Sequence, residues 1–247
     1  MNIRNILKKL ALSFGFDLVR TNNFVKYPPA RRRKLIADLG IDLIFDVGAN
    51  TGQFALQMRK EGYKGRIISF EPMSSAFKEL EKRAASDSNW EAVNIALGGE
   101  DGKTDINISE NSYSSSILDI MPSHVAADAS SSYVKQESVE VRRMDTIIDT
   151  YFNSGDKLYV KIDTQGYEKN IIIGAENSLK DIHGLQMEMS LVPLYQDELL
   201  MPDMIKHMNL KGFISWSFEE EFQEPHTGQL LQVNGIFVKN EVAPKAG

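Results

Sequence analysis

Hydrophobic and polar positions follow two different spacings in turn along most of the chain, which predicts strands and helices one after another. Short apolar runs are typical of strands buried on both faces, and the segments between them have helical spacing. The predicted strands are 41–47, 66–70, 90–95, 104–109, 138–143, 158–162, 185–189, 212–218 and 230–239. The predicted helices are 30–39, 53–60, 74–85, 166–179 and 201–209. This order indicates an α/β protein with a mostly parallel sheet covered by helices.

Only a turn-rich loop, 219–227, separates the last two predicted strands. Two successive strands joined without a helix form an antiparallel hairpin, so the last strand of the sheet is expected to be reversed. We find no repeat or linker that divides the chain. The expected organisation is a helical extension (1–35), a single domain (36–240) and a short tail (241–247).

The segment 98–145 interrupts the regular alternation with a polar, serine-rich stretch. An insertion of this length in a compact domain is typical of a functional lid or of a loosely ordered loop. Both interpretations stay open from the sequence.

The N-terminal segment has Ile3, Ile6, Leu7 and Leu10 at helical spacing, with Arg4, Lys8 and Lys9 on the other side. We expect a helix that packs on the domain or on a partner subunit, which offers a route to a homo-oligomer. Attachment to an anionic membrane is the alternative. No apolar run has the length of a membrane span, and no signal peptide is recognisable, so a cytoplasmic protein is expected.

Composition removes several classes of function. The 247 residues include 28 basic and 34 acidic ones, for a net charge of −6, which argues against a nucleic-acid partner. The chain has no cysteine, and this excludes disulfides, thiolate zinc sites and cysteine nucleophiles. Four histidines do not make a metal cluster, and no metal site is predicted.

A glycine-rich turn lies between the first buried strand and the next helix. Gly48 and Gly52 are separated by three residues, which differs from the G-x-G-x-x-G pattern of dinucleotide sites. A carboxylate at Asp46 would repel a pyrophosphate but could accept hydrogen bonds from an ammonium group. Glu71 ends the second strand, nineteen residues past Gly52, where it could accept both hydroxyls of a ribose. The pattern favours a cofactor that carries an amino acid.

Three motifs resemble those of class I S-adenosylmethionine-dependent methyltransferases, and within them the FkbM-type group. Asp46-Val-Gly-Ala-Asn-Thr-Gly52 is similar to motif I, Ser69-Phe-Glu-Pro72 to the ribose-binding motif, and Lys161-Ile-Asp-Thr-Gln-Gly-Tyr-Glu168 to Lys-Ile-Asp-x-Glu-Gly-x-Glu. Gln165 departs from the commoner glutamate. Further matches at 96–98, 173–175, 194–195 and 228–237 extend the resemblance over residues 36–239.

The resemblance implies a three-layer Rossmann-like fold with a seven-stranded sheet whose last strand is antiparallel. It also implies S-adenosylmethionine as cofactor and S-adenosylhomocysteine as product. The cofactor-binding positions that it suggests are Asp46, Gly48, Asn50, Thr51, Gly52, Phe54, Glu71, Pro72, Asn94, Ala96, Leu97 and Asp163. A turn residue is an equal alternative for Asn94.

The acceptor side is expected around Asp163, which would orient or deprotonate the acceptor; a helix N-cap is the alternative. Lys161 shares a strand face with Asp163 and is expected to pair with Glu188, with Glu168 nearby. The alternative is a direct catalytic role for Lys161 and Glu188, or binding of a divalent ion by the Asp163, Glu168 and Glu188 carboxylates. His226 is either close to the acceptor or a solvated turn residue. The expected acceptor-binding residues are Tyr113, Ser114, Ser115, Gln165 and Glu168.

The expected activity is O-methylation of a sugar, a glycan or a small metabolite, which for sugars follows from the resemblance. An amine nitrogen is the alternative acceptor. A catalytically idle cofactor-binding module and an NAD-dependent oxidoreductase are alternatives of other classes, and the glycine spacing disfavours the last.

Overall fold

Residues 3–16, 18 and 22–244 are described by the computed structural model of the chain. They fall into two units, residues 1–38 and 39–247. The first unit holds α1 (Ile3–Ser13) and all but the last residue of α2 (Pro28–Leu39). Both prolines of α2 lie in its first turn, where a missing N–H group leaves no helical hydrogen bond unmade. None of the helices in the described residues is long and apolar enough to cross a bilayer.

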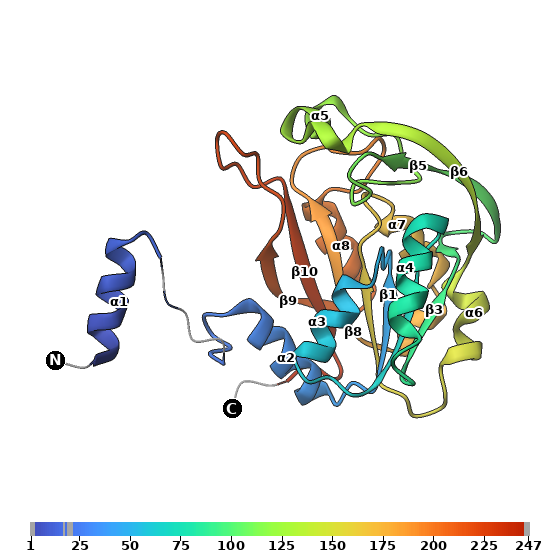
Figure 1. Cartoon of the computed structure of the whole chain (residues 1–247). Helices are drawn as coiled ribbons and strands as arrows, with labels where there is room; N and C mark the ends of the chain where they lie inside the picture. The colour runs from blue at the N-terminus through green and yellow to red at the C-terminus, as the bar shows by residue number, and fades with distance from the viewer. Residues whose placement is uncertain (1–2, 17, 19–21, 245–247) are drawn as a thin grey trace. The chain divides into compact units, whose positions relative to one another are not determined.

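A seven-stranded sheet in the order β3-β2-β1-β7-β8-β10-β9 forms the centre of the second unit (Figure 1). β10 runs antiparallel to both of its neighbours, and the other neighbouring pairs are parallel, as the hairpin pattern predicts. The strands are β1 (Leu43–Val47), β2 (Arg66–Phe70), β3 (Trp90–Val93), β7 (Leu158–Ile162), β8 (Ile182–Ser190), β9 (Phe213–Glu220) and β10 (Gln232–Lys239).

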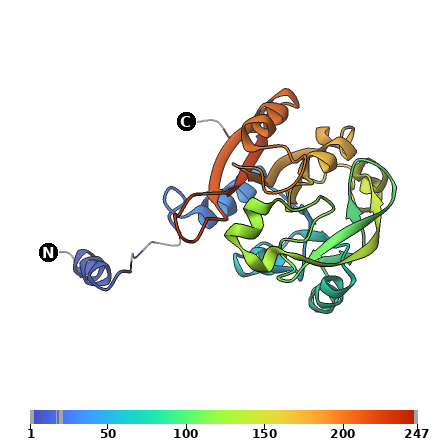
Figure 2. The ribbon, with the colours of Figure 1, turned by 90° about the horizontal axis from the view of Figure 1, so that it is seen from above.

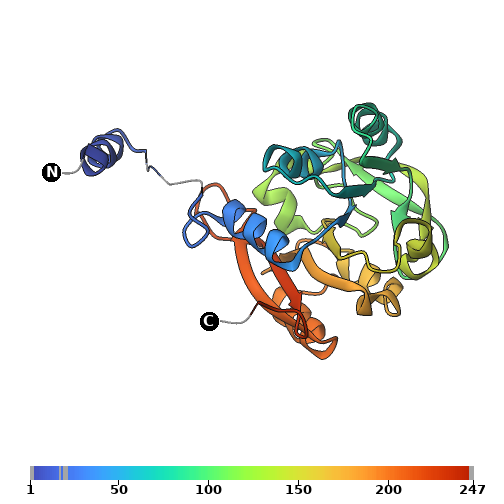
Figure 3. The same cartoon turned by 90° about the horizontal axis from the view of Figure 1, so that it is seen from below.

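Helices cover both faces of this sheet and complete the three layers. Seen from below, α3 (Gln53–Lys60) and α4 (Ser74–Ala84) lie on one side, and α7 (Glu168–Gly174) and α8 (Met201–Leu210) on the other (Figure 3). α6 (Met144–Tyr151), for which no element was predicted, packs beside α7. Every residue of β1 and of β7 is buried, because these central strands have neighbours on both edges and helices on both faces.

α7 is shorter than the helix predicted over 166–179. It begins at Glu168 because Gln165 and Gly166 have left-handed backbone conformations, with φ of +57° and +94°. It ends at Gly174, and the chain continues in the 3-10 turn η2 (Ser178–Lys180), where Asp145 accepts hydrogen bonds from the N–H groups of residues 177 and 178. The predicted extent was therefore wrong at both ends.

The inserted region builds a second layer on the carboxyl ends of the central strands. β4 (Ala96–Leu97), β5 (Gly102–Ser109) and β6 (Tyr133–Arg142) form a three-stranded sheet in the order β4-β6-β5. The view from above shows this sheet with α5 (Pro122–Ala127), which is followed by η1 (Ala129–Ser131), across the end of the main sheet (Figure 2). β6 begins five residues before the strand predicted at 138, so much of the serine-rich stretch belongs to a hydrogen-bonded layer.

Candidate active site

A cavity with about 640 Å³ of empty space opens where β1, β2 and β7 end. The turns after these strands form its floor and the inserted layer forms its roof, so residues far apart in sequence share its wall. It is lined by Val47, Gly48, Asn50, Phe70, Glu71, Pro72, Met73, Ile95, Ala96, Leu97, Ile106, Ser112, Tyr113, Ser115, Ser116, Ile117, Asp163, Thr164, Gln165 and Tyr167.

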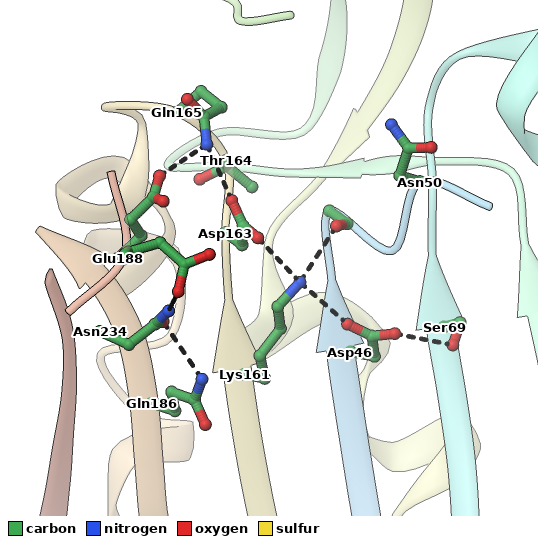
Figure 4. A network of polar contacts seen from close by, with 12 residues as sticks. Asp46, Asn50, Ser69, Lys161, Asp163, Thr164, Gln165, Gln186, Glu188 and Asn234 are labelled. Carbon is green, nitrogen blue, oxygen red and sulfur yellow. Dashed lines mark hydrogen bonds and ion pairs between the residues drawn. The ribbon is translucent and has the colours of Figure 1, made fainter. Parts of the chain in front are cut away.

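Under the cavity floor, the Lys161 ammonium joins the ends of β1 and β7. Its Nζ lies 3.2 Å from Asp46 Oδ1 and 3.4 Å from Asp163 Oδ2, and donates to the Gly48 carbonyl at 3.2 Å (Figure 4). Asp46 and Lys161 are register partners on adjacent parallel strands, so their side chains point to the same face. Two carboxylates at ion-pair distance and one hydrogen bond to a carbonyl compensate a charge that would be costly to bury alone.

The charge state of Lys161 follows from these neighbours. Burial alone would lower the pKa of the ammonium group, but the Asp163 and Asp46 carboxylates together raise it above its ordinary value. Lys161 therefore stays charged at physiological pH and holds two carboxylates that would otherwise repel each other.

Gly48 is required by the contact between the two turns. Its φ is +72°, and a Cβ atom there would lie 1.9 Å from the Asp163 carbonyl oxygen. The first obstacle to a side chain at this position is therefore the backbone of the neighbouring turn. Asn50 also has a left-handed φ, +47°, which asparagine tolerates better than most residues.

The N–H groups of the glycine-rich turn are all used inside the protein. Phe70 O accepts those of residues 48 and 49, Glu71 Oε2 accepts that of Asn50, Asn50 Oδ1 accepts that of Thr51, and Ala49 O accepts that of Gly52. A pyrophosphate bound at such a turn needs free N–H donors. The donor set therefore does not fit a dinucleotide and agrees with the prediction from the glycine spacing.

Glu71 presents a buried carboxylate to the cavity. Its two oxygens accept hydrogen bonds from the N–H groups of Asn50 (2.7 Å) and Met73 (2.9 Å), which fix its orientation and leave further acceptor capacity. Burial raises the pKa of Glu71 to about 7, against the opposing effect of these hydrogen bonds. A carboxylate held in this way fits the paired hydroxyls of a ribose.

Asp163 is the carboxylate that faces the cavity from β7. One oxygen contacts Lys161, and the other accepts a hydrogen bond from Gln165 Nε2 at 3.0 Å. The side chain is nevertheless 39% exposed, so Lys161 and Gln165 fix its orientation while part of the carboxylate stays accessible from the cavity. The alternative role as a helix N-cap is wrong, because α7 begins five residues later with no side-chain cap.

Gln165 connects Asp163 to a buried network on β8. Its Nε2 also donates to Glu188 Oε2 at 2.6 Å (Figure 4). Its Oε1 accepts a hydrogen bond from the Tyr195 hydroxyl at 2.7 Å. Gln232 donates to the same Glu188 oxygen. Burial, followed by the nearby Asp163 and Glu168 carboxylates, raises the pKa of Glu188 well above its ordinary value.

The expected ion pair between Lys161 and Glu188 is wrong. The register of β7 and β8 places Gln186, not Glu188, opposite Lys161. Lys161 turns towards β1 instead, because Asp46 and the Gly48 carbonyl lie on that side. Glu188 does not line the cavity and reaches it only through Gln165, so the structure gives it a supporting position.

Glu168 also supports the site from behind. Its Oε1 accepts hydrogen bonds from the N–H groups of Thr164 and Gly166 and from the Thr164 hydroxyl. This ties the left-handed turn to the start of α7, and burial raises the pKa of Glu168 to about 7. In the part of the chain that the structure describes, no group of three or more His, Cys, Asp or Glu residues is arranged to hold a metal ion.

Besides Lys161, Glu168 and Glu188, seven of the predicted positions lie outside the cavity wall. Asp46 is completely buried, and Thr51 accepts a hydrogen bond from Arg83. Asn94 donates to the Glu71 and Pro72 carbonyls, which agrees with its alternative role in a turn. His226 lies on an exposed hairpin loop, where its N–H donates to Glu224. The others are Gly52, Phe54 and Ser114.

Gly52 has a packing role. A Cβ atom there would lie 2.7 Å from the Trp90 ring. The Trp90 indole donates to Ser69 Oγ at 2.9 Å, and this hydroxyl lies 3.3 Å from Asp46 Oδ2. The glycine thus lets an aromatic ring lie against the cofactor turn and extends the polar network under the floor.

Several residues of the site were not predicted. Tyr195 was noted only as part of a motif, yet its buried hydroxyl orients Gln165. Ser116 donates to the Gln165 carbonyl and lines the cavity, and Tyr167 also lines it. The serine-rich composition offered a signal for Ser116, whereas the contact of Tyr195 depends on tertiary structure alone.

Comparisons with known proteins give the following similarities. A crystal structure of methyltransferase FkbM from Methylobacillus flagellatus KT is 13% identical, with a TM-score of 0.45, over 79% of this chain and 43% of that one. This chain therefore spans less than half of that protein. A putative RNA methyltransferase from Pyrococcus horikoshii is 12% identical, with a TM-score of 0.44, over 94% and 98% of the two chains. No curated protein matches the sequence.

A third solved structure is TrmK from M. capricolum in complex with S-adenosylhomocysteine, which is 7% identical with a TM-score of 0.47 over 84% of this chain and 68% of that one. The family model of the methyltransferase FkbM domain matches residues 46–215, which is more than half of the chain. That range begins at Asp46 and includes Glu71 and the segment 161–168. The chain belongs to the FkbM methyltransferase-domain family.

Proposed function

We propose that this enzyme methylates a hydroxyl oxygen of a sugar or of another small polar molecule, and that Asp163 orients that hydroxyl. The observation that carries the proposal is the position of Asp163: both carboxylate oxygens are held by side chains of the protein, and the carboxylate still faces the cavity. An acceptor hydroxyl that donates to this carboxylate would keep a lone pair free for the incoming methyl group.

The proposed cofactor site uses the wall between Glu71 and Asp163. Glu71 would accept hydrogen bonds from the ribose hydroxyls, and the apolar wall of Ala96, Leu97 and the neighbouring Ile95 would hold the adenine. Gly48 lies beside Asp163, on the side proposed for the amino-acid part, and Asn50 lies beside Glu71. When bound, S-adenosylmethionine supplies a methyl group on a positively charged sulfur.

In the proposed transfer, a bond forms between the acceptor oxygen and the methyl carbon while the carbon–sulfur bond breaks. The acceptor hydroxyl loses its proton, and Asp163 is the carboxylate placed to accept it. Lys161 keeps this side chain aimed at the cavity from below, and Gln165 fixes its other oxygen. Both therefore act as positioning residues.

A small acceptor is supported by the lining of the inserted layer. Tyr113 exposes 65% of its side chain at the cavity, and its hydroxyl accepts a hydrogen bond from Gln53. Ser115 and Ser116 add hydroxyl groups to the same wall. An aromatic face beside hydroxyl donors suits a sugar ring, which has an apolar face and a polar edge.

Charge supports a small acceptor over RNA. Residues 39–247, which contain the cavity, include 19 basic and 32 acidic residues. Binding to a phosphate backbone needs a positive field over a broad face, and this unit has the opposite balance. Nucleic acid is therefore not among the proposed acceptors.

Asp163→Asn tests the proposal. Loss of the general base should lower kcat by about 10²-fold or more, whereas the Kd for S-adenosylhomocysteine should change by less than about threefold. Methyl transfer from radiolabelled S-adenosylmethionine to a panel of sugars, polyols and amines identifies an acceptor, and calorimetry gives the Kd. Asp105→Asn, on an exposed stretch of β5, is the matched control.

Two results would contradict the proposal. Equal loss of turnover and cofactor affinity in Asp163→Asn would assign the residue to cofactor binding. Transfer to amines alone would replace the hydroxyl acceptor by nitrogen. Asp163→Ala also removes the contacts to Lys161 and Gln165. Comparison of its turnover with that of Asp163→Asn, after circular dichroism has shown that both variants fold, separates the loss of the base from the loss of these contacts.

A further inference from the structure

Positive charge is concentrated in the first unit of the chain. Residues 1–38 contain nine lysines and arginines against two aspartates, whereas the rest of the chain has an excess of acidic residues. Five of the nine lie outside the run 31–34, so the charge is spread along the unit and is not due to this cluster alone. The proposed function uses none of these residues.

Large apolar side chains of the same unit are exposed. Ile6, Leu7 and Leu10 lie on one face of α1 at helical spacing and are 44%, 53% and 55% exposed. Phe14 and Phe16, just after the helix, are 71% and 69% exposed. Side chains of this size, gathered on one short segment, are typical of a surface that contacts another apolar phase.

Lys8 and Lys9 lie between the apolar positions in sequence and are also exposed. Helical geometry turns them away from the face that Ile6, Leu7 and Leu10 share. An amphipathic helix with lysines flanking its apolar face is suited to the boundary between lipid headgroups and acyl chains. The lysines would contact phosphate groups while the apolar side chains enter the acyl region.

We propose that α1 and the phenylalanines after it bind the surface of a membrane that contains anionic lipids. The apolar face accounts for insertion at the interface, and the excess of basic residues over the whole unit accounts for the requirement for anionic lipid. The interaction is peripheral, since α1 is only 11 residues long.

The basic residues and the exposed apolar side chains of the first unit together favour a membrane over RNA or a second copy of the chain as its partner. RNA would use the basic residues but would leave Ile6, Leu7, Leu10 and both phenylalanines in water. A second copy of the helix would cover the apolar face but would bring two strongly positive units together. Anionic lipid satisfies both features at once.

The test uses the full-length protein and sedimentation with vesicles. Vesicles of phosphatidylcholine with 30% phosphatidylglycerol should bind the protein at least tenfold more tightly than vesicles of phosphatidylcholine alone. Leu7→Asn combined with Leu10→Asn should weaken binding at least tenfold, and Lys8→Gln combined with Lys9→Gln should reduce the preference for phosphatidylglycerol. Leu210→Asn, at an exposed position of α8, is the matched control and should bind like the unaltered protein.

Three outcomes would overturn the proposal. One is the absence of binding to anionic vesicles. Another is tight binding of a fluorescent single-stranded RNA that the leucine variant retains and the lysine variant loses, without vesicle binding. The third is a dimer, detected by analytical ultracentrifugation, that the leucine variant abolishes while vesicles bind neither protein. Affinity for S-adenosylhomocysteine should be the same in all variants, which keeps this test independent of the proposed acceptor chemistry.

Discussion

Glu71 combines deep burial with a position at the cavity wall, and this makes its protonation relevant to cofactor binding. Its pKa is raised to about 7, mainly by burial, so its ionised fraction increases from about a tenth at pH 6 to about nine tenths at pH 8. The ionised form is the better acceptor for two ribose hydroxyls. The affinity for S-adenosylhomocysteine should therefore increase several-fold over this range.

Calorimetric titration at pH 6, 7 and 8 checks this expectation. Glu71→Gln should bind more weakly and without the pH dependence. Glu137→Gln, which alters a half-buried carboxylate of β6 that accepts hydrogen bonds from Ser74 outside the cavity, should behave like the unaltered protein. The same pH dependence in Glu71→Gln would assign it to another group.

Gly48 allows a second prediction, because a matched glycine is available. Gly48 and Gly155 both have a left-handed φ, +72° and +100°, but a Cβ atom at Gly155 would meet nothing within 4 Å. Gly155→Ala should cost about 1–2 kcal/mol of the free energy of unfolding from backbone strain alone. Gly48→Ala should cost clearly more, since the turns after β1 and β7 must also move apart.

Chemical denaturation measures both variants. The separation of the turns should also weaken cofactor binding in Gly48→Ala and leave it unchanged in Gly155→Ala. Equal destabilisation by the two substitutions would show that the contact with Asp163 is relaxed at little cost.

In the turn between β7 and α7, the side-chain amide of Gln165 holds two carboxylates in place. Gln165 donates from a single nitrogen to Asp163 on β7 and to Glu188 on β8. A carboxylate in its place would face two others, and one of the three would take up a proton. Gln165→Glu should therefore lower the free energy of unfolding by about 1–3 kcal/mol at pH 8.

The stability loss caused by Gln165→Glu should depend on pH, and the direction of that dependence follows from the raised pKa of a buried carboxyl group. A carboxyl group whose pKa is raised in the folded state binds its proton more tightly there, so stability is lost as the pH rises through that pKa. The destabilisation by Gln165→Glu should be smaller at pH 5.5 than at pH 8. Gln165→Met removes the hydrogen bonds without adding charge and should lack this pH dependence. Identical profiles for the two variants would contradict the explanation.

Sequence analysis located best those helices and strands along which the pattern of burial does not change. β2, β7 and α3 have the predicted bounds, because a strand buried on both faces is mostly apolar and a surface helix repeats one spacing. β4 was missed because two residues carry no period. The start of α7 was misplaced because Gln165 adopts a left-handed conformation that glycine usually provides.

The site itself was only partly predictable. Glu71, Gly48 and Asp163 were identified because they occupy the ends of strands, and parallel strands end at the same edge of a sheet. The partner of Lys161 was wrong, since it depends on the register between β7 and β8 and on the turn that follows β1. Register and side-chain direction are tertiary properties that one sequence does not specify.

Taken as a whole, the molecule divides its charge between its two units. The unit with the cavity is acidic and the N-terminal unit is basic, although the net charge of −6 conceals this. Such a division suits a protein that uses one unit for chemistry on a small acceptor and the other for contact with a negatively charged surface. Added salt should therefore weaken the attraction of the N-terminal unit to an anionic surface and reduce the repulsion between that surface and the acidic unit.

The indole of Trp90 has a further consequence, because the chain contains only one other tryptophan. It lies against Gly52 and donates to Ser69, which is next to Asp46. In a Trp216→Phe background, Trp90 is the sole indole emitter. Its fluorescence would then be an optical reporter of the cofactor turn, responding to any shift of that backbone without a label attached to the protein.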